Sequence, residues 1–376
     1  MTARSSWVGA ALAVQLMLGA CGGGDAPLVI GVAGPFSQPR GESMRLAAEL
    51  ARDEINRAGG VRGRPLELRF LDDSGSTDGA VSVAVALAED PAVVAVVGHL
   101  TSGATLAAAP VYAGVREPVP LVTPSASSPE ITHAGDHVFR VCPSDLAHGA
   151  QLGDFAWREL GVRRVAVLFH NDGYGRGVRR AFADRYRALG GAVLSEDPYL
   201  PSLSTFGPYL QRLKARGAEA VLVAGNRAEA ERILATMDSL GLDLPVLGAD
   251  GLTGVQSPRG HDAAVYVSRI YTPDAADAAN RAFVDAYREA FGGRSPDHRG
   301  AGAYDIVHLL ARGVQRVGAD RSALRDYLAE VGGEEKVYDG VLGGIAFDEN
   351  GDTRARMVSV TQVAGAGVMV TSQGGR

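Results

Sequence analysis

The chain has little of several things that mark specialised classes of protein. Only two of its 376 residues are cysteine, 6% are aromatic, and the net charge is −6. Two cysteines cannot build a disulfide scaffold, and the mild negative charge argues against the broad basic surface that binds nucleic acid, so we expect no nucleic-acid partner. Long charged or polar tracts are also missing, and 46% of the residues are hydrophobic. We therefore expect a folded chain, large enough for two lobes.

The signature motifs of common enzymes are missing as well. No Gly-x-Ser-x-Gly nucleophile elbow and no Gly-x-x-x-x-Gly-Lys-Ser/Thr phosphate loop occurs. Residues 173–177 (GYGRG) follow a predicted strand like a dinucleotide loop, but Val178 stands where the third glycine belongs. His133 and His137 are four apart, yet Gly135 lies between them and the glutamate of a zinc-binding HExxH motif is missing. We expect no enzyme, no cofactor and no metal site.

The first 21 residues differ from the rest of the chain. A positive start is followed by a mostly apolar run at 8–18 and by Leu-Gly-Ala-Cys, which is typical of a secretory signal and too short for a permanent membrane span. Leu-Gly-Ala-Cys resembles the bacterial lipobox, which implies that Cys21 is acylated and anchors the protein through a flexible tether at 22–27. The alternative is an ordinary cleaved signal peptide, in which Cys21 is removed or has no role as an anchor. With Cys21 acylated, Cys142 has no disulfide partner.

From residue 28 onward, apolar runs of strand length alternate with stretches of helical periodicity. We expect strands at 28–33, 66–71, 92–98, 119–122, 138–141, 164–169, 192–196, 220–223 and 246–248. We expect helices at 42–55, 81–87, 104–113, 147–160, 177–189, 206–216, 228–240, 277–291, 302–317 and 323–331, and final β-like segments near 344–347, 357–363 and 368–371. The alternation predicts an α/β fold with two doubly wound parallel sheets.

Two loops that follow predicted strands are rich in hydroxyl groups. Thr101 and Ser102 open a helix, whose unpaired N–H groups favour a carboxylate or a phosphate. Residues 123–130 (TPSASSPE) form a run of small polar side chains between two prolines, which suits hydrogen bonding to an ammonium and a carboxylate. Ligands in open α/β sheets bind at such strand ends. The alternatives are a simple helix cap in the first case and a surface turn in the second.

A series of segments in fixed order covers nearly the whole mature chain. It comprises GPFSQPRGESMRLAAELARDEINRAGGVRGRPLEL, LDDSGSTDGAVSVAVALAED, VVGHLTSGATLAAAPVY, PLVTPSASSPEIT, FRVCPSD, NDGYGRG, LGADG and FDENGD. This series resembles the periplasmic leucine/isoleucine/valine-type amino-acid binding proteins of ABC transporters. The resemblance implies a type I periplasmic-binding fold, whose two lobes are joined by a three-segment hinge. We expect one lobe to comprise 28–145 with 273–353, and the other 146–272 with 354–376.

The resemblance also implies roles for five residues. Ser102 and Ser127 would supply hydroxyl and backbone donors to the α-carboxylate of the ligand. Ala126 would offer its carbonyl to the α-ammonium. Asp250 would pair with the same ammonium from the other lobe, and Tyr174 would form an aromatic wall. A buried zwitterion needs both of its charges paired. The alternatives are a capping role for Asp250 and a packing role for Tyr174.

The sequence departs from the branched-chain pattern in the expected side-chain pocket. Arg40 stands where the family often has an aromatic residue, and Asn226 and Arg227 stand where tyrosines line the second lobe. Two arginines facing the cleft would suit a ligand with an additional acidic group, because guanidinium pairs bidentately with carboxylate. Equally, both arginines could be solvated at the rim of the cleft.

These features together predict an extracytoplasmic binding protein. We expect it to capture an amino acid or related small carboxylate between its lobes and to deliver it to an ABC permease. We expect a periplasmic monomer that touches the membrane only through its lipid anchor. A ligand sensor of the same fold is the main alternative, and an enzyme is a further one.

Overall fold

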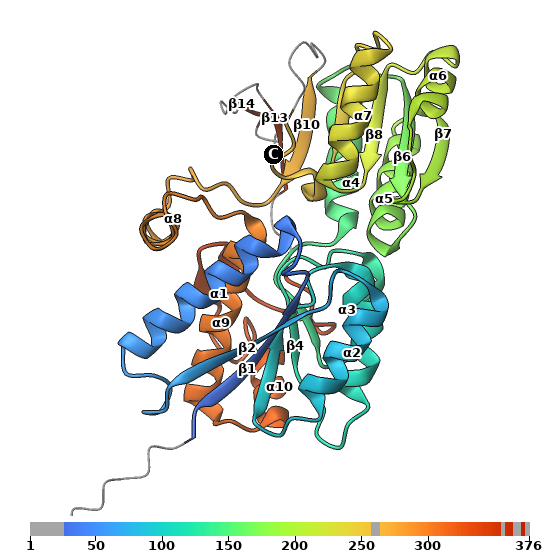
Figure 1. Ribbon diagram of the computed structural model, residues 1–376. Coiled ribbons are helices and arrows are strands. Elements are labelled where there is room, and N and C mark those ends of the chain that lie inside the picture. Colours follow the sequence, from blue (N-terminus) through green and yellow to red (C-terminus); the bar gives the residue numbers. More distant parts are fainter. Residues whose placement is uncertain (1–25, 257–263, 355–357, 364–369, 373–376) are drawn as a thin grey trace, which may run out of the picture.

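The computed structural model describes residues 26–256, 264–354, 358–363 and 370–372. It shows two α/β lobes, one drawn mainly in blue, cyan and orange and the other mainly in green and yellow (Figure 1). No helix within these ranges combines the length and the apolar character that a membrane crossing requires. The proposed lipid anchor Cys21 lies outside the described residues, so its acylation stays a prediction.

The first lobe is built on five parallel strands in the order β2-β1-β3-β4-β5. The strands are β1 (Leu28–Gly34), β2 (Leu66–Asp72), β3 (Val93–Val97), β4 (Leu121–Thr123) and β5 (Val138–Arg140). All residues of β1 and β3 are buried, because helices cover both faces of the sheet. Ile30 and Val32 of β1 pack with Met44 of helix α1 (Pro39–Arg57), whereas Val29 packs with Ala84 of α2 (Thr77–Ala88).

The second lobe repeats the same strand order with two additions. Its strands are β6 (Arg164–His170), β7 (Ala192–Tyr199), β8 (Ala220–Ala224), β9 (Val246–Gly248), β10 (Val265–Arg269), β13 (Ser359–Val363) and β14 (Val370–Ser372). The order β7-β6-β8-β9-β10 is parallel and corresponds to that of the first lobe, and β13 and β14 add antiparallel strands beyond β10. Its helices are α4 (Asp145–Arg158), α5 (Gly173–Ala188), α6 (Gly207–Ala215) and α7 (Arg227–Ser239).

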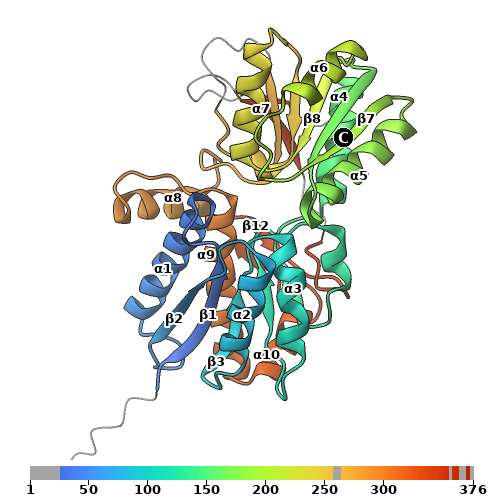
Figure 2. The ribbon, with the colours of Figure 1, turned by 45° about the vertical axis from the view of Figure 1, so that its right-hand side comes forward.

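The chain passes between the lobes three times. It leaves the first sheet after β5 and returns after β10 as helices α8 (Ala278–Ala290), α9 (His298–Val317) and α10 (Arg321–Ala329) and the hairpin β11 (Tyr338–Gly340)–β12 (Gly343–Ile345). Ile306, Leu310 and Phe347 belong to the same hydrophobic cluster as Leu28 of β1. The chain then crosses back to form β13. In the turned view of Figure 2, α9 and α10 lie with the first lobe, and the connections run between the two bodies. Two doubly wound parallel sheets joined by three crossings agree with the α/β fold that the sequence predicted.

Several helices begin earlier than the sequence predicted, among them α5 and α9, each of which an aspartate caps. The carboxylate of Asp172 accepts a hydrogen bond from the backbone N–H of Gly175 at 2.7 Å, so GYGRG forms the first turns of α5 rather than a loop. The carboxylate of Asp297 accepts hydrogen bonds from Arg299 and Gly300 at 2.9 and 3.1 Å, so α9 begins at His298 instead of residue 302. Both helix starts point toward the space between the lobes.

Strand β10 was not predicted at all. Its residues VYVSR carry a serine and an arginine, so the apolar run is short, and pairing on both sides decides its structure. Short helices at Pro129–His133 and Asp250–Leu252 were not predicted either. Among the described residues no cluster of His, Cys, Asp or Glu has the arrangement of a metal site.

Candidate ligand-binding site

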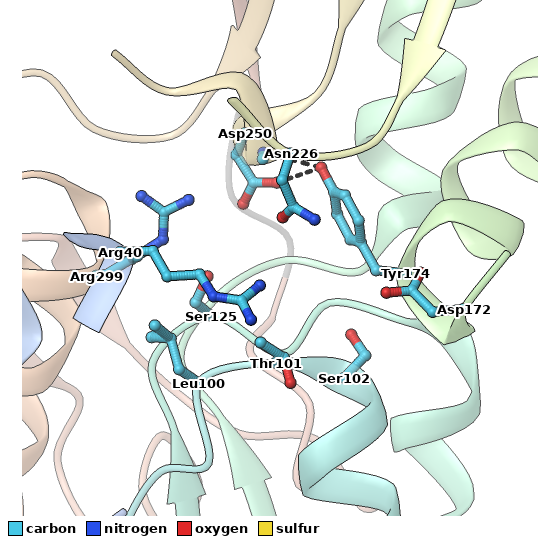
Figure 3. A pocket seen from close by; sticks show the side chains of 11 residues that line it. Arg40, Leu100, Thr101, Ser102, Ser125, Asp172, Tyr174, Asn226, Asp250 and Arg299 are labelled. Carbon is cyan, nitrogen blue, oxygen red and sulfur yellow. Dashed lines mark hydrogen bonds between the residues drawn. The ribbon is translucent and has the colours of Figure 1, made fainter. Parts of the chain in front are cut away.

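A small cavity lies between the lobes, at the carboxyl ends of strands from both sheets. We call it the inner cavity, and its volume is about 40 Å³. It is lined by Arg40, Leu100, Thr101, Ser102, Ser125 and Arg299 from the first lobe and by Asp172, Tyr174, Asn226, Asp250 and Gly251 from the second (Figure 3). Most of these residues directly follow a strand of one of the two sheets, the position at which α/β sheets bind ligands. Five of the seven predicted site residues meet here: Arg40, Ser102, Tyr174, Asn226 and Asp250.

The wall of the first lobe centres on the start of α3 (Ser102–Ala113). The Thr101 hydroxyl accepts a hydrogen bond from the backbone N–H of Ala104 at 3.3 Å and thereby caps the helix. The Ser102 hydroxyl oxygen accepts a hydrogen bond from the backbone N–H of Ser128 at 3.1 Å. Each hydroxyl keeps its own proton available for donation, and the helix start adds a positive dipole. The turn therefore offers hydrogen-bond donors and a positive dipole to an anion.

The hydroxyl-rich loop at 123–130 presents one residue to the inner cavity, and that residue is Ser125. Ala126 and Ser127 are buried behind it, and neither lines the cavity. Ala126 packs in the hydrophobic cluster beneath α3, and the Ser127 hydroxyl makes no hydrogen bond within the described part of the chain. The ligand roles that the resemblance implied for Ala126 and Ser127 stay predictions.

The wall of the second lobe is held together by a tyrosine. The Tyr174 hydroxyl donates to Oδ1 of Asp250 at 3.1 Å and accepts from the backbone N–H of Gly251 at 2.8 Å. Gly175 allows this arrangement, because a Cβ there would come within 2.1 Å of the carbonyl oxygen of His170. A larger residue would push the start of α5, and Tyr174 with it, away from Asp250. Tyr174 thus orients the carboxylate as well as forming a wall.

Asp250 is almost completely buried, at 2% exposure, and it lies near two histidines from different lobes. Its Oδ2 lies 3.9 Å from Nε2 of His148 and 3.6 Å from Nε2 of His298 and forms no hydrogen bond within the described ranges. Burial alone raises the pKa of Asp250, but His148, His298 and Arg299 outweigh burial and lower it. Burial and Arg299 lower the pKa of His298 to about 4. The positive charge of Arg299 remains where the imidazole of His298 is neutral, so Asp250 is ionised and can bind a cation.

A second buried carboxyl group, that of Asp145, lies at the first crossing between the lobes. Burial, and next the charge of Asp250, raise its pKa well above the ordinary value. Neither oxygen of Asp145 accepts a hydrogen bond of good geometry in the described chain, although the Ser127 hydroxyl lies nearby. Asp145 therefore tends to hold a proton, and Asp250 remains the charged member of the pair.

The opposite end of the inner cavity opens into a larger space. This outer cavity has a volume of about 650 Å³ and shares Arg40, Asn226, Gly251 and Arg299 with the inner one. We call these four residues the passage. Figure 3 shows the guanidinium groups of Arg40 and Arg299 on the same side of the inner cavity, across from Tyr174. The passage is thus lined by two cations.

Known proteins resemble this chain over most of its length. A family model described as "Periplasmic binding protein" matches residues 27–367. The chain belongs to this family. An "Amino acid binding protein" of Pseudomonas aeruginosa is 29% identical over 92% of this chain and 92% of its own length. A "Leucine-, isoleucine-, valine-, threonine-, and alanine-binding protein" of the same organism is 28% identical over 86% of this chain and 87% of its own.

Solved structures of this family superpose on the chain throughout. The branched-chain amino acid transporter substrate-binding protein LivJ of Streptococcus pneumoniae, in complex with isoleucine, has a TM-score of 0.81 and 28% identity. The match covers 92% of this chain and all of that one. The predicted relationship to the branched-chain-type periplasmic binding proteins, with their type I fold, is confirmed. Members of this family are binding proteins of transporters, so the prediction of a non-enzyme is confirmed as well.

Of the two arginines that the sequence of this periplasmic binding protein placed at the cleft, Arg40 lines both cavities and Arg227 lines the outer one. Arg227 does not line the inner cavity, and its guanidinium pairs with Glu231 one helical turn away, at 2.7 Å. Arg299 lines both cavities instead. Its signal in the sequence was weak but present. Arg299 follows Asp297, a typical N-cap, so it stands in the first turn of a helix, where a basic residue is unfavourable unless it has another purpose.

Proposed function

We propose that this protein is an extracytoplasmic solute-binding protein that holds an amino acid or a related small carboxylate between its lobes. The observation that carries the proposal is the pairing across the inner cavity of the α3 start, with Thr101 and Ser102, and the ionised Asp250. An anion site and a cation site on opposite walls suit a zwitterion. The α-carboxylate would accept hydrogen bonds at Ser102, and the α-ammonium would donate to the free Oδ2 of Asp250.

Binding would work by closure of the lobes. We propose that residues 28–145 with 273–353 and residues 146–272 with 354–376 move as two bodies about the three crossings. The inner cavity, at about 40 Å³, has room for only about three water molecules. A ligand must therefore enter while the lobes are apart, and closure then removes water and strengthens each charged hydrogen bond.

Delivery to an ABC permease is the second part of the proposal, and it rests on the family. Relatives of this chain include a leucine-, isoleucine-, valine-, threonine- and alanine-binding protein and a transporter substrate-binding protein solved in complex with isoleucine. We propose a monomer that is anchored by acylated Cys21 and presents its closed form to the permease. A sensor with the same lobes but no transport role is the alternative. Loss of labelled amino-acid uptake on deletion would favour transport.

Thermal denaturation with a panel of amino acids and small carboxylates tests the binding function. A ligand that binds only the folded state stabilises it by about 2.7 kcal/mol at 100 times its Kd, which is an easily measured shift in Tm. We expect at least one amino acid or small carboxylate to produce such a shift, with mass spectrometry showing it unchanged afterwards. A panel without any shift would contradict the proposal. Mass spectrometry of membrane-extracted protein tests the anchor, which Cys21→Ser would abolish.

A further inference from the structure

We propose that the ligand carries a second carboxylate, beyond its α-carboxylate, and that Arg40 and Arg299 hold it at the passage. This inference rests on the proposed function and specifies the class of substrate. The α-carboxylate and the α-ammonium are assigned to Ser102 and Asp250, so the remaining part of the ligand points toward the passage. The inner cavity has room for only about three waters, and the outer cavity, which shares the passage residues with it, has the volume for the rest of the ligand.

Arg40 is a half-buried cation that forms no ion pair among the described residues, although Glu229, Asp73 and Asp172 lie near enough to act on its charge. Its Nε is buried and has no hydrogen-bond partner, and no carboxylate within the described ranges comes within ion-pair distance of its guanidinium. Burial, and next the positive charge of Arg299, lower the pKa of Arg40. Desolvation of a charge is unfavourable unless the charge is paired, so an anion bound at this point would offset the partial burial of Arg40.

Arg299 reinforces the same field. It is 9% exposed, and its Nη1 forms an ion pair with Asp297 at 2.7 Å, so only the part of the guanidinium that faces away from Asp297 is available at the passage. Both arginines lie in the first turn of a helix, α1 for Arg40 and α9 for Arg299, and the positive ends of these helices add to the two side-chain charges. Guanidinium pairs bidentately with carboxylate, so two of them in one passage favour that group in particular.

The surroundings are poorly suited to a branched apolar side chain. Among the residues that line the inner cavity, only Leu100 and the ring of Tyr174 offer large apolar groups, and the Tyr174 ring lies at the head-group end beside Asp250. At the passage the other lining groups are the amide of Asn226 and the backbone of Gly251. A leucine side chain placed there would desolvate the two guanidinium groups without pairing them.

The acids of the second lobe leave these cations available. Asp172 is paired with His170 at 3.1 Å, and Asp250 is assigned to the ammonium. Glu229 lines the outer cavity, and its buried Oε2 has no hydrogen-bond partner in the described part of the chain. Glu229 therefore makes the field at the outer cavity less positive without neutralising Arg40. Substitution of Glu229 should thus change the affinity for an acid in the opposite direction to substitution of Arg40.

Isothermal titration tests the inference with ligands of matched shape. The protein is first freed of carried-over ligand by unfolding and refolding, and is then titrated with glutamate, glutamine, aspartate, asparagine and leucine. Glutarate, which lacks the amine, is included to separate an acidic amino acid from a simple dicarboxylate. We expect one acid to bind about 10- to 100-fold more tightly than its amide, the range for hydrogen bonds to charged groups.

Two variants locate the effect at the passage. Arg40→Gln should weaken the acid by about 10- to 100-fold and leave the affinity for its amide nearly unchanged. Glu229→Gln should strengthen the acid, because it removes a like charge. The control is Arg45→Gln on the same helix. Arg45 pairs with Glu49, its side chain is 42% exposed, and it lines neither cavity, so this variant should behave as the wild type.

The possible outcomes separate the inference from the function beneath it. Tight leucine binding without any response to the acids would overturn the inference and keep the proposed function. Acid binding that Arg40→Gln does not change would overturn the role of the arginines. Failure of every amino acid and carboxylate to bind would overturn the proposed function itself.

Discussion

The two ends of the inner cavity are built in different ways. At the end that we assign to the head group of the ligand, each polar side chain is fixed inside the protein. Tyr174 bridges Asp250 and Gly251, and Ser102 is tied to the backbone of Ser128. At the passage, Arg40 has no ion-pair partner among the described residues, and the Asn226 side chain makes no capping hydrogen bond to α7. The head-group end is therefore preorganised, and the passage still has groups to satisfy.

This difference separates affinity from selectivity. A preorganised group that pairs with a part common to all amino acids raises their affinity equally. An unpaired cation discriminates, because it rewards a ligand with a matching charge and penalises one without it. Substitutions at the head-group end should thus weaken all ligands together, and substitutions at the passage should change the ratio between ligands.

The largest effect is expected from Asp250→Asn. The variant keeps the shape of the side chain but removes the charge that faces the ammonium, so every amino acid that binds should lose about 2–5 kcal/mol, with unchanged ratios between them. Isothermal titration measures this loss. Asp184→Asn is the matched control, since Asp184 is exposed and pairs only with Arg180 on the same helix. A loss of affinity for one ligand alone would contradict the proposal that Asp250 binds the group common to all amino acids.

A pH-dependent contribution to stability is expected from His298, which lies between the two ends. Its pKa is about 4 in the folded protein, because of burial and Arg299, against about 6.5 when unfolded. Between these values the unfolded chain binds more protons, so the contribution is complete above pH 6.5 and is lost as the pH falls toward 4. Its full size is about 3 kcal/mol.

Urea unfolding at several pH values measures this contribution. The free energy of unfolding of His298→Gln should fall less steeply than that of the wild type between pH 6.5 and 4. His133→Gln is the control, because His133 is exposed on the first lobe. Parallel curves for His298→Gln and the wild type would show that His298 is not held neutral.

The hydroxyl groups of the first lobe give a smaller effect, which tests the position of the wall. Ser102→Ala removes a donor at the start of α3 and should cost every ligand about 1.5–3 kcal/mol in isothermal titration. Ser127→Ala should cost less than about 1 kcal/mol, because Ser127 lies behind the lining residues. If the order of the two losses were reversed, the anion site would centre on Ser127 instead.

The last effect expected lies at the crossing between the lobes, and it concerns stability instead of affinity. Asp145→Asn replaces a buried carboxyl group whose pKa is raised by burial and by Asp250. A raised pKa means that the folded state holds a proton that the unfolded state releases above pH 4, so the wild type loses stability as the pH rises. The variant should be more stable than the wild type at pH 7, by about 1 kcal/mol or more, and this gain should vanish near pH 4. Thermal denaturation at the two pH values measures the difference.

Most of the fold could be predicted, because apolar runs buried on both faces, such as Val93–Val97, have a distinct pattern. Strand β10 was not predicted, because its pairing with β9 and β13, rather than its composition, makes it a strand. The head-group end was predictable in part, since Ser102, Tyr174 and Asp250 each follow a strand or begin a helix within a recognisable motif.

The passage could be predicted only in part: Arg40 and Asn226 were expected there, but Arg299 was not, because its place depends on the direction in which side chains point and on the return of the chain. Asn226 and Arg227 are neighbours in sequence, yet the start of α7 turns Arg227 toward Glu231 and leaves Asn226 at the inner cavity. Arg299 comes from a helix more than 250 residues away from Arg40, and only the return of the chain to the first lobe brings the two together.

The most direct measurement is a crystal structure of the protein with the amino acid that stabilises it most. We predict the α-ammonium within hydrogen-bonding distance of Oδ2 of Asp250 and the α-carboxylate at the hydroxyl of Ser102, with the lobes closed around both. A ligand bound with these two groups exchanged, or bound outside the space between the lobes, would contradict this account.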